Sequence, residues 1–404
     1  MAPAFKTFAD QNPTIKVDVV YAADHRTKLA TQMASGTAPD TFIHDVWSAA
    51  KYYDGGEILD LGARFKADKI DLAQQYSLIG IEQWCGKTFA VPFYVTSMLL
   101  AYNKDILQKY GAPDPWEKWN GNWTWTDFLD VARTVTRQPS SESPSGTYAL
   151  RIDGSGIDNI DRNMQMWATS NGGETFNLDS MRYTLDDPKT VDAFDFLNKL
   201  VNDYKVMVGP EQQAALSKAS NVDSFIAGFV AFQQNSTGTL PQYYQLIKDK
   251  FAWDVVPYPH GQGSDFIGHS DADVTNVYAH GKHPDESYQF ARFLGGPVTQ
   301  EVLSVNKLLI PALKSAAQDP QGFLKPPPAH LSAFLDPLKA GQFRTSFYQY
   351  NGLQAISLQD EQLKLAFSRQ KGTKEAMLDA NTASNAVVQH GPCHQTVTWQ
   401  PRRA

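Results

Sequence analysis

The chain has 404 residues, of which 42% are hydrophobic and 20% are charged, a balance that excludes a disordered or membrane-embedded protein. Lysine and arginine number 36 against 43 acidic residues, and the net charge of −7 argues against a general nucleic-acid binder, which needs a basic face. The length favours two or three domains.

The first 60 residues alternate between helix and strand patterns. A helix is expected through Phe5 and Phe8, followed by a half-buried strand over 15–19. Asp24 is the expected cap of a second helix, and a further strand is expected over 41–43. This order favours a parallel sheet covered by helices.

The later part of the chain continues the mixture of helices and strands. The pattern predicts, in chain order, an extended run over 89–102, a helix capped by Thr126, a helix opened by Pro188, a strand over 253–256 and a helix over 284–294. The segment 319–328 holds four prolines, so we expect it to be irregular.

No catalytic signature is present. The sequence lacks a phosphate-binding loop, a nucleophile elbow and the zinc-protease and kinase motifs, and we expect no metal and no cofactor. The pair of carboxylates that a glycoside hydrolase uses is defined by a distance in space, so a carbohydrate-active hydrolase stays open as an alternative. Cys85 and Cys393 exclude a disulfide framework but leave open one long-range bridge.

Several short stretches, in order, resemble one family. They are Phe8–Val17 (FADQNPTIKV), Gly36–Phe42 (GTAPDTF), Gly86–Pro92 (GKTFAVP), Tyr102–Asp105 (YNKD), Trp125–Phe128 (WTDF), Phe225–Phe232 (FIAGFVAF), Trp253–Pro259 (WDVVPYP) and Tyr288–Leu294 (YQFARFL). Together they resemble the extracellular solute-binding proteins of family 1, the maltose-binding-protein-like subunits of ABC importers. The resemblance covers residues 5 to about 388.

The resemblance implies an α/β fold of the type II periplasmic-binding-protein class. Two lobes, each a mainly parallel sheet with helices on both faces, would be joined by a three-segment hinge that crosses near Pro92, Pro257 and Pro311. The predicted first lobe comprises 1–95 and 258–311, the second lobe 96–257 and 312–390, and a tail 391–404.

The family also implies the function. We expect non-catalytic binding of a carbohydrate, an oligosaccharide, in the cleft between the lobes, and its delivery to a membrane ABC permease. The expected partners are a sugar and the permease, with no nucleic acid, and the chain is expected to be a monomer. Relatives also bind glycerol phosphates, and a signalling receptor of the same fold is a third possibility.

Family position points to candidate ligand residues in the first lobe. His44, Asp45 and Trp47 follow the strand over 41–43, where a carboxylate can accept sugar hydroxyls and an indole can stack on a sugar face. Trp47 could instead pack the next helix. Tyr94 and Thr96 match cleft positions of the family, with packing inside a lobe as the alternative.

The remaining candidates come from the second lobe and the crossings. Asn235 and Thr237 follow the strand near 228–232, and His269 lies at the mouth of the second crossing. Arg162 and Tyr348 complete the predicted set. Relatives often carry a tryptophan near Thr237, and this chain has none there.

The N-terminus departs from the family pattern. Relatives begin with a signal peptide and a first strand, whereas Met1 falls inside the first family helix. We expect a longer, exported protein of the periplasm or cell exterior, with a lipoprotein form left open. The alternative is that residues 395–400, which have strand character, sit against the first sheet.

Overall fold

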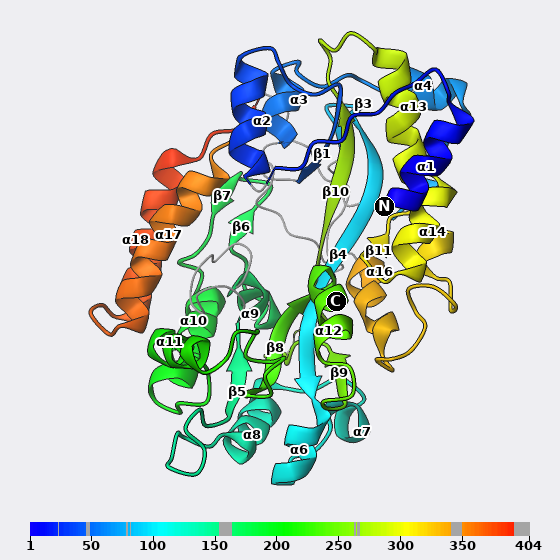
Figure 1. The fold of residues 1–404 in the computed structure, drawn as a ribbon. Coiled ribbons are helices and arrows are strands. Elements are labelled where there is room, and N and C mark those ends of the chain that lie inside the picture. The colour runs from blue at the N-terminus through cyan, green and yellow to red at the C-terminus, as the bar shows by residue number, and fades with distance from the viewer. Residues whose placement is uncertain are drawn as a thin grey trace.

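The computed structural model describes residues 1–22, 24–45, 49–77, 80, 82–152, 164–261, 264, 267–340 and 350–391, with the backbone alone for His44 and Asp45. Figure 1 shows an α/β molecule with two lobes, one above the other. None of the helices in these ranges is long and apolar enough to span a membrane.

The strands are β1 (Thr41–Asp45), β2 (Gln83–Trp84), β3 (Lys87–Thr88), β4 (Ala90–Asn103), β5 (Tyr148–Arg151), β6 (Phe176–Asn177), β7 (Arg182–Tyr183), β8 (Val230–Ser236), β9 (Trp253–Val256), β10 (His269–Val277) and β11 (Ile310–Pro311).

The helices of the first 220 residues are α1 (Ala2–Gln11), α2 (His25–Ala34), α3 (Ala49–Asp54), α4 (Gly62–Ala67), α5 (Leu72–Gln75), α6 (Lys104–Tyr110), α7 (Pro115–Trp119), α8 (Trp125–Val135), α9 (Gln165–Ser170), α10 (Pro188–Asn202) and α11 (Pro210–Ala219). They are followed by η3 (Thr237–Thr239), α12 (Leu240–Leu246), α13 (Pro284–Gly295), α14 (Pro297–Val305), α15 (Lys314–Ala317), η4 (Leu331–Leu335), α16 (Asp336–Ala340), α17 (Gly352–Phe367) and α18 (Thr373–Val387).

One strand, β4, runs through both lobes (Figure 1). The sheet order is β1-β10-β4-β8-β5, and β9 and β11 also pair with β4. The first half of β4 pairs with β10, and its second half pairs with β8 and β9. We call the part around β1, β10 and the first half of β4 the upper lobe, and the part around β5, β8, β9 and the second half of β4 the lower lobe.

A bulge lies near the start of β4. The register with β10 shifts where Pro92 faces Val274 and Tyr94 faces Asp273, so that Phe93 has no residue opposite it. Proline lacks a backbone amide, and a bulge is one of the few places where a strand tolerates it. β11 pairs with Val95 and Tyr94 just beyond this point.

The predicted strand direction is wrong in the described residues. β5 and β8 form a parallel pair, whereas the other described pairs are antiparallel. The alternation of helix and strand near the N-terminus suggested a parallel sheet, but it cannot show which strands become neighbours. β1 pairs with β10, which comes more than 200 residues later and returns in the opposite direction.

The predicted strand over 15–19 is also wrong. This segment is not in a strand, and Val19, Val20 and Tyr21 are 41%, 67% and 82% exposed. Extended chain becomes a strand only when a neighbouring strand satisfies its amides and carbonyls. Among the described residues, the segment has no such neighbour, since β1 pairs with β10 alone.

Most predicted helices and strands are confirmed, with one change of cap. The structure contains the predicted elements near 5–12, 41–43, 89–102, 188, 253–256 and 284–294, and Asp24 accepts a hydrogen bond from the Thr27 amide. Helix α8, however, is capped by Thr124 and not by Thr126. Thr124 and Asp127 form a reciprocal capping box, in which each side chain bonds the other's backbone amide.

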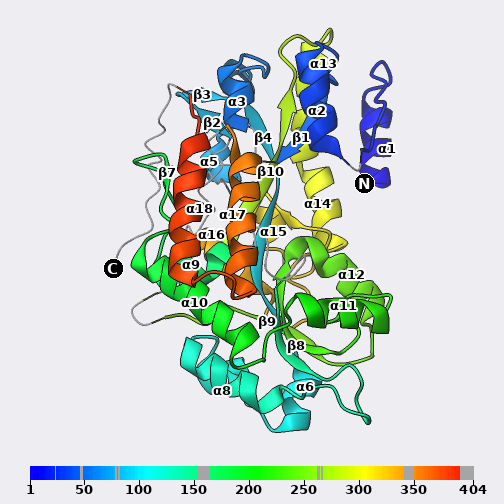
Figure 2. The ribbon, with the colours of Figure 1, turned by 90° about the vertical axis from the view of Figure 1, so that its left-hand side faces the viewer.

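Aromatic side chains fill the core of the lower lobe. Trp123, Phe128 and Phe232 are buried with ring centroids 5.4–5.9 Å apart, and Trp167 packs 5.7 Å from Phe128. The ring of Phe196, on α10, stacks on Trp125 at 4.6 Å. Figure 2 shows α17 and α18 side by side, and both helices pack against α10. These contacts attach the C-terminal helices to the lower lobe.

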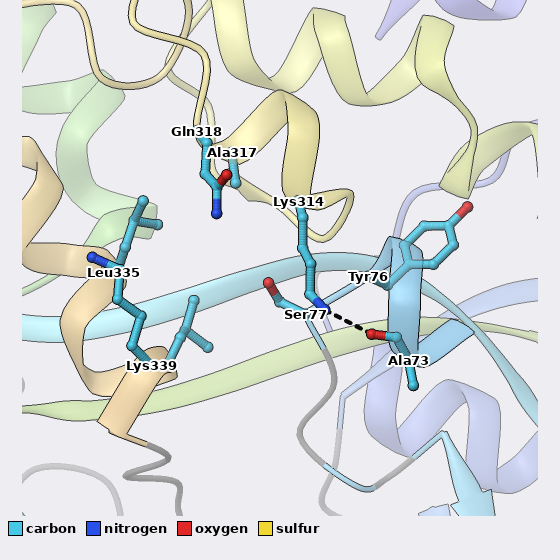
Figure 3. Close-up of a pocket in the computed structure, with 9 residues that line it drawn as sticks. Ala73, Tyr76, Ser77, Lys314, Ala317, Gln318, Leu335 and Lys339 are labelled. Carbon is cyan, nitrogen blue, oxygen red and sulfur yellow. Dashed lines mark hydrogen bonds between the residues drawn. The ribbon is translucent and has the colours of Figure 1, made fainter. Parts of the chain in front are cut away.

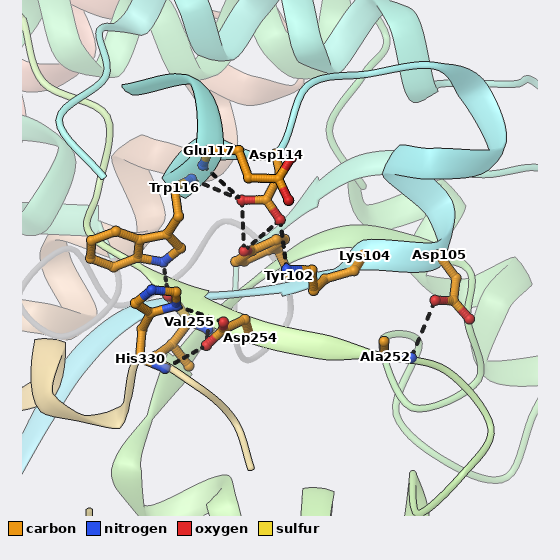
Figure 4. A network of polar contacts seen from close by, with 10 residues as sticks. All are labelled: Tyr102, Lys104, Asp105, Asp114, Trp116, Glu117, Ala252, Asp254, Val255 and His330. Atoms are coloured by element: carbon orange, nitrogen blue, oxygen red, sulfur yellow. Dashed lines mark hydrogen bonds and ion pairs between the residues drawn. The ribbon is translucent and has the colours of Figure 1, made fainter. Parts of the chain in front are cut away.

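A polar network joins the segment before η4 to the lower lobe (Figure 4). The carboxylate of Asp254, which is buried, accepts from the Nδ1 of His330 at 2.7 Å and from its backbone amide at 3.0 Å. The indole of Trp116 stacks on the imidazole at 4.1 Å and donates to the carbonyl of Val255. On the neighbouring strand β4, the hydroxyl of Tyr102 donates to Asp114, which also accepts from the backbone amide of Trp116.

Candidate ligand-binding site

The middle of β4 presents one half-exposed face. Tyr94, Thr96 and Met98 are half-buried, while the alternating residues Val95 and Ser97 are fully buried. Successive side chains of a strand point to opposite faces, so the three half-buried residues share one face. The two residues predicted here from the sequence, Tyr94 and Thr96, therefore lie on the accessible side of the strand.

Two carboxylates of β10 lie on the same face. Asp273 stands opposite Tyr94, and Asp271 stands opposite Thr96. Both acids are half-buried, and they alternate with the buried Ala272. The hydroxyl of Tyr94 donates a hydrogen bond to Asp273 Oδ2. We call Tyr94, Thr96, Asp271 and Asp273 the hinge face.

The register extends the hinge face to a third strand. Asp45, at the end of β1, pairs with Asp273 across the sheet. The backbone positions of Asp45, Asp273 and Tyr94 thus form a row across β1, β10 and β4. In this row Asp273 supplies hydrogen-bond acceptors, and Thr96 on the same face supplies a hydroxyl that can donate to a hydroxylated ligand.

Three further candidates lie around the middle of β4 but are buried. Thr237 is fully buried and its Oγ1 accepts from the Ser97 amide at 3.3 Å. His269 is 6% exposed, and its Nδ1 lies 3.1 Å from Gln165 Nε2. Asn235 is 1% exposed, and its Nδ2 has no hydrogen-bond partner among the described residues. These three side chains pack around the part of β4 that passes from the upper lobe to the lower lobe. The side-chain amide of Asn235 is a donor without a partner among the described residues.

The other candidates cannot be placed. Trp47, Arg162 and Tyr348 lie outside the described residues, as do the side chains of His44 and Asp45. Within the described ranges, no three His, Cys, Asp or Glu side chains lie close enough to hold a metal ion.

Sequence reasoning missed Asp271 and Asp273. The segment HSDADVTNV carries a clear signal, because acids alternate with apolar residues over 271–274, as expected for a strand with one buried face. The sequence pattern predicted no strand there, and His269 was the one candidate in this segment.

A pocket of about 340 Å³ lies away from these residues (Figure 3). It is lined by Tyr76 and Ser77 on one side and by residues of α15 and α16 on the other. Lys314 reaches from α15 to α5, where its Nζ donates to the carbonyl of Ala73 at 2.6 Å. None of the predicted ligand residues lines this pocket.

A half-buried lysine lies beside the third expected crossing. Lys307, just after α14, donates to the carbonyls of Pro327, at 2.8 Å, and of Lys325. Its ammonium lies 4.6 Å from the centroid of the Tyr244 ring on α12, in the lower lobe. Burial, together with the nearby charge of Lys325, lowers the pKa of Lys307 to about 8. Lys307 therefore links the end of α14 to the lower lobe.

The sequence profile of the bacterial extracellular solute-binding proteins matches residues 1–301, and the chain belongs to this family. It is 22% identical over 314 residues to a probable ABC transporter-binding protein of Deinococcus radiodurans, an alignment that covers 76% of this chain and 70% of the relative.

Two solved structures share the fold. An ABC substrate-binding protein of Listeria monocytogenes, solved in complex with cycloalternan, has a TM-score of 0.82 and 22% identity, with 96% of this chain and 95% of that chain covered. The maltose-bound MalE3 of T. maritima has a TM-score of 0.76 and 20% identity, with 96% and 95% covered. The two-lobed α/β fold expected from the sequence is confirmed.

Proposed function

We propose that the protein binds a carbohydrate, an oligosaccharide, between its two lobes and delivers it to the permease of an ABC importer. The observation that carries this proposal is membership of the solute-binding family over residues 1–301. The two similar structures described above hold cycloalternan and maltose, which supports an oligosaccharide as the ligand class.

The hinge face supplies the chemistry for such a ligand. Asp271 and Asp273 can each accept hydrogen bonds from two sugar hydroxyls, and Thr96 can donate or accept. Asp45 joins this set through its register with Asp273. Trp47 and Tyr348 remain our proposals for stacking on the apolar faces of the sugar.

The course of β4 supports the proposed lobe boundaries. The strand changes partners near Met98, from β10 in the upper lobe to β8 in the lower lobe. The proposed division of 1–95 with 258–311 against 96–257 with 312–390 places this change close to the first crossing. The bulge at Phe93 gives β4 a local bend at which the lobes can rotate.

We propose no catalytic step. The family and the similar structures consist of substrate-binding proteins, and nothing in the described residues favours the hydrolase alternative. The family also supports a location outside the cytoplasmic membrane, with the permease as partner.

A thermal-shift screen against oligosaccharides, followed by calorimetry of the hits, tests the proposal. A true ligand present at 100 times its dissociation constant stabilises the fold by about 2.7 kcal/mol. Chromatography of the ligand after prolonged incubation should recover it unchanged. Release of shorter sugars would overturn the binding-only function, and a complete absence of hits among oligosaccharides would overturn the ligand class.

A further inference from the structure

Asp54 joins the two lobes at one edge of the molecule. It ends α3, in the upper lobe, where its neighbour Tyr53 stacks on Phe89 at 4.5 Å. The carboxylate of Asp54 accepts from the indole of Trp84 at 2.7 Å and from the hydroxyl of Tyr350 at 2.5 Å. Tyr350 lies just before α17, which packs against the lower lobe.

The chain after α18 returns to the contact between Asp54, Trp84 and Tyr350, which we call the junction. The amide of Tyr350 donates to the carbonyl of Gln389 at 2.6 Å, and Asn351 donates to the carbonyl of Val387. Gly391 is buried against both Asp54 and Tyr350, so closely that a Cβ atom at this position would collide with their oxygens. The segment 387–391 is therefore packed between the two lobes.

The junction also holds a disulfide-bonded cysteine. Cys85 follows Trp84 in the turn between β2 and β3, and it is disulfide-bonded. The sequence contains one other cysteine, Cys393, which lies outside the described residues. Cys393 comes two positions after Gly391, which packs beside Asp54.

We propose that Cys85 and Cys393 form a disulfide that straps the chain following α18 to the upper lobe and limits how far the lobes can separate. Because α18 packs on α10, the strap would connect the lower lobe covalently to the β2–β3 turn. This inference concerns the oxidation state of the protein and goes beyond the proposed binding function.

The chemistry of the strap is thiol–disulfide exchange. The two thiols lose two protons and two electrons as the sulfur–sulfur bond forms, and an external disulfide accepts the electrons and becomes two thiols. A dithiol reductant reverses the step and is itself oxidised to a disulfide. Such bonds persist in the oxidising compartments where extracellular proteins work.

Peptide mapping under non-reducing conditions tests the pairing. Trypsin cleaves the chain into peptides 70–87 and 375–402, which carry Cys85 and Cys393 respectively. We expect one mass equal to the two joined peptides in protein purified without reductant, and its loss after treatment with a dithiol. Two separately alkylated thiols, or peptide 70–87 joined to a second copy of itself, would overturn the proposal.

Small-angle scattering of the ligand-free protein tests the consequence for the lobes. Reduction of the wild-type chain should increase its radius of gyration, and Cys85→Ser and Cys393→Ser should show the larger radius with or without reductant. Far-UV circular dichroism confirms that the variants are folded. Equal radii for oxidised and reduced wild-type protein would show that the bond does not restrain the lobes.

Ligand exchange supplies an independent readout. Opening must precede release, so reduction should raise the dissociation rate of a bound oligosaccharide. The same rate in oxidised and reduced protein would contradict the strap. The mapping and scattering measurements need no sugar, so their failure would leave the proposed binding function intact.

Discussion

Asp273 occupies the centre of the row formed by Asp45, Asp273 and Tyr94. It is half-buried, and an ionised carboxylate at such a position makes stronger hydrogen bonds than a neutral group. Asp273→Asn keeps the shape and the acceptor for Tyr94 but removes the charge. We expect the variant to lose about 1.5–3 kcal/mol of ligand-binding free energy, measured by calorimetry with an oligosaccharide hit.

The control for this prediction is Asp249→Asn, which removes an exposed carboxylate after α12. Both variants should melt near the wild-type temperature in the absence of ligand. If Asp273→Asn binds the ligand as tightly as the control, Asp273 does not belong to the site.

Lys307 should make the stability of the protein depend on pH in the alkaline range. An ordinary lysine has a pKa of about 10.4, whereas that of Lys307 is about 8 in the folded chain. Between these values the unfolded chain binds more protons than the folded chain, so this residue's contribution makes stability rise with pH. Below pH 8 the cost of burying the charge is fully present.

Lys307→Met removes this contribution. Urea denaturation at intervals from pH 7.5 to pH 10.5 should show that the free energy of unfolding of the wild type rises relative to that of the variant. The exposed Lys250→Met is the matched control and should follow the wild type. A constant difference between the wild type and Lys307→Met across this range would contradict the lowered pKa.

At the level of elements, the residue that caps helix α8 differs from the one predicted from the sequence. The hydroxyl of Thr124 accepts from the Asp127 amide, and the Asp127 carboxylate accepts from the Thr124 amide. Thr126, in contrast, lies inside the helix. Thr124→Ala should destabilise the fold by about 1 kcal/mol, because it leaves the backbone amide of Asp127 unsatisfied. Thr126→Ala should change the unfolding free energy less, and the reverse order in urea denaturation would contradict the assigned cap.

The sequence predicted elements better than it predicted their neighbours. Local signals such as Pro188 and the apolar run over 89–102 identified α10 and β4, because these patterns depend on residues close in the chain. The failed strand over 15–19 has the right alternation but lacks a strand to pair with. Strand direction failed for the same reason, since pairing is a property of the whole fold.

The candidate site shows the same difference between features set by local patterns and features set by strand pairing. Tyr94 and Thr96 were found through the family pattern and lie on the accessible face of β4. Thr237 and His269 were chosen for their positions after a family strand and at the second crossing, and both are buried in the structure. Asp271 and Asp273 were missed although their alternation with Ala272 and Val274 signals a strand; their position beside Thr96 and Tyr94 depends on the register between β10 and β4, which no local pattern encodes.

At the scale of the whole molecule, ligand binding should make the protein more compact. The lobes share β4, which changes partners near its middle, so rotation about this strand can bring them together. Small-angle scattering of reduced protein should show a smaller radius of gyration at a saturating concentration of an oligosaccharide hit. An unchanged radius would contradict closure of the lobes around the ligand.

The distance in sequence between β1 and its partner has a consequence for synthesis. Thr41 pairs with Val277, so the ribosome completes β10 roughly 10–50 seconds after it completes β1, at about 5–20 residues per second. Throughout that interval the segment that will become β1 has no strand to pair with, and unpaired apolar segments of this kind are prone to aggregation. The late arrival of β10 also delays folding of the upper lobe, and a chain that has not yet folded is still able to thread through a protein-conducting channel.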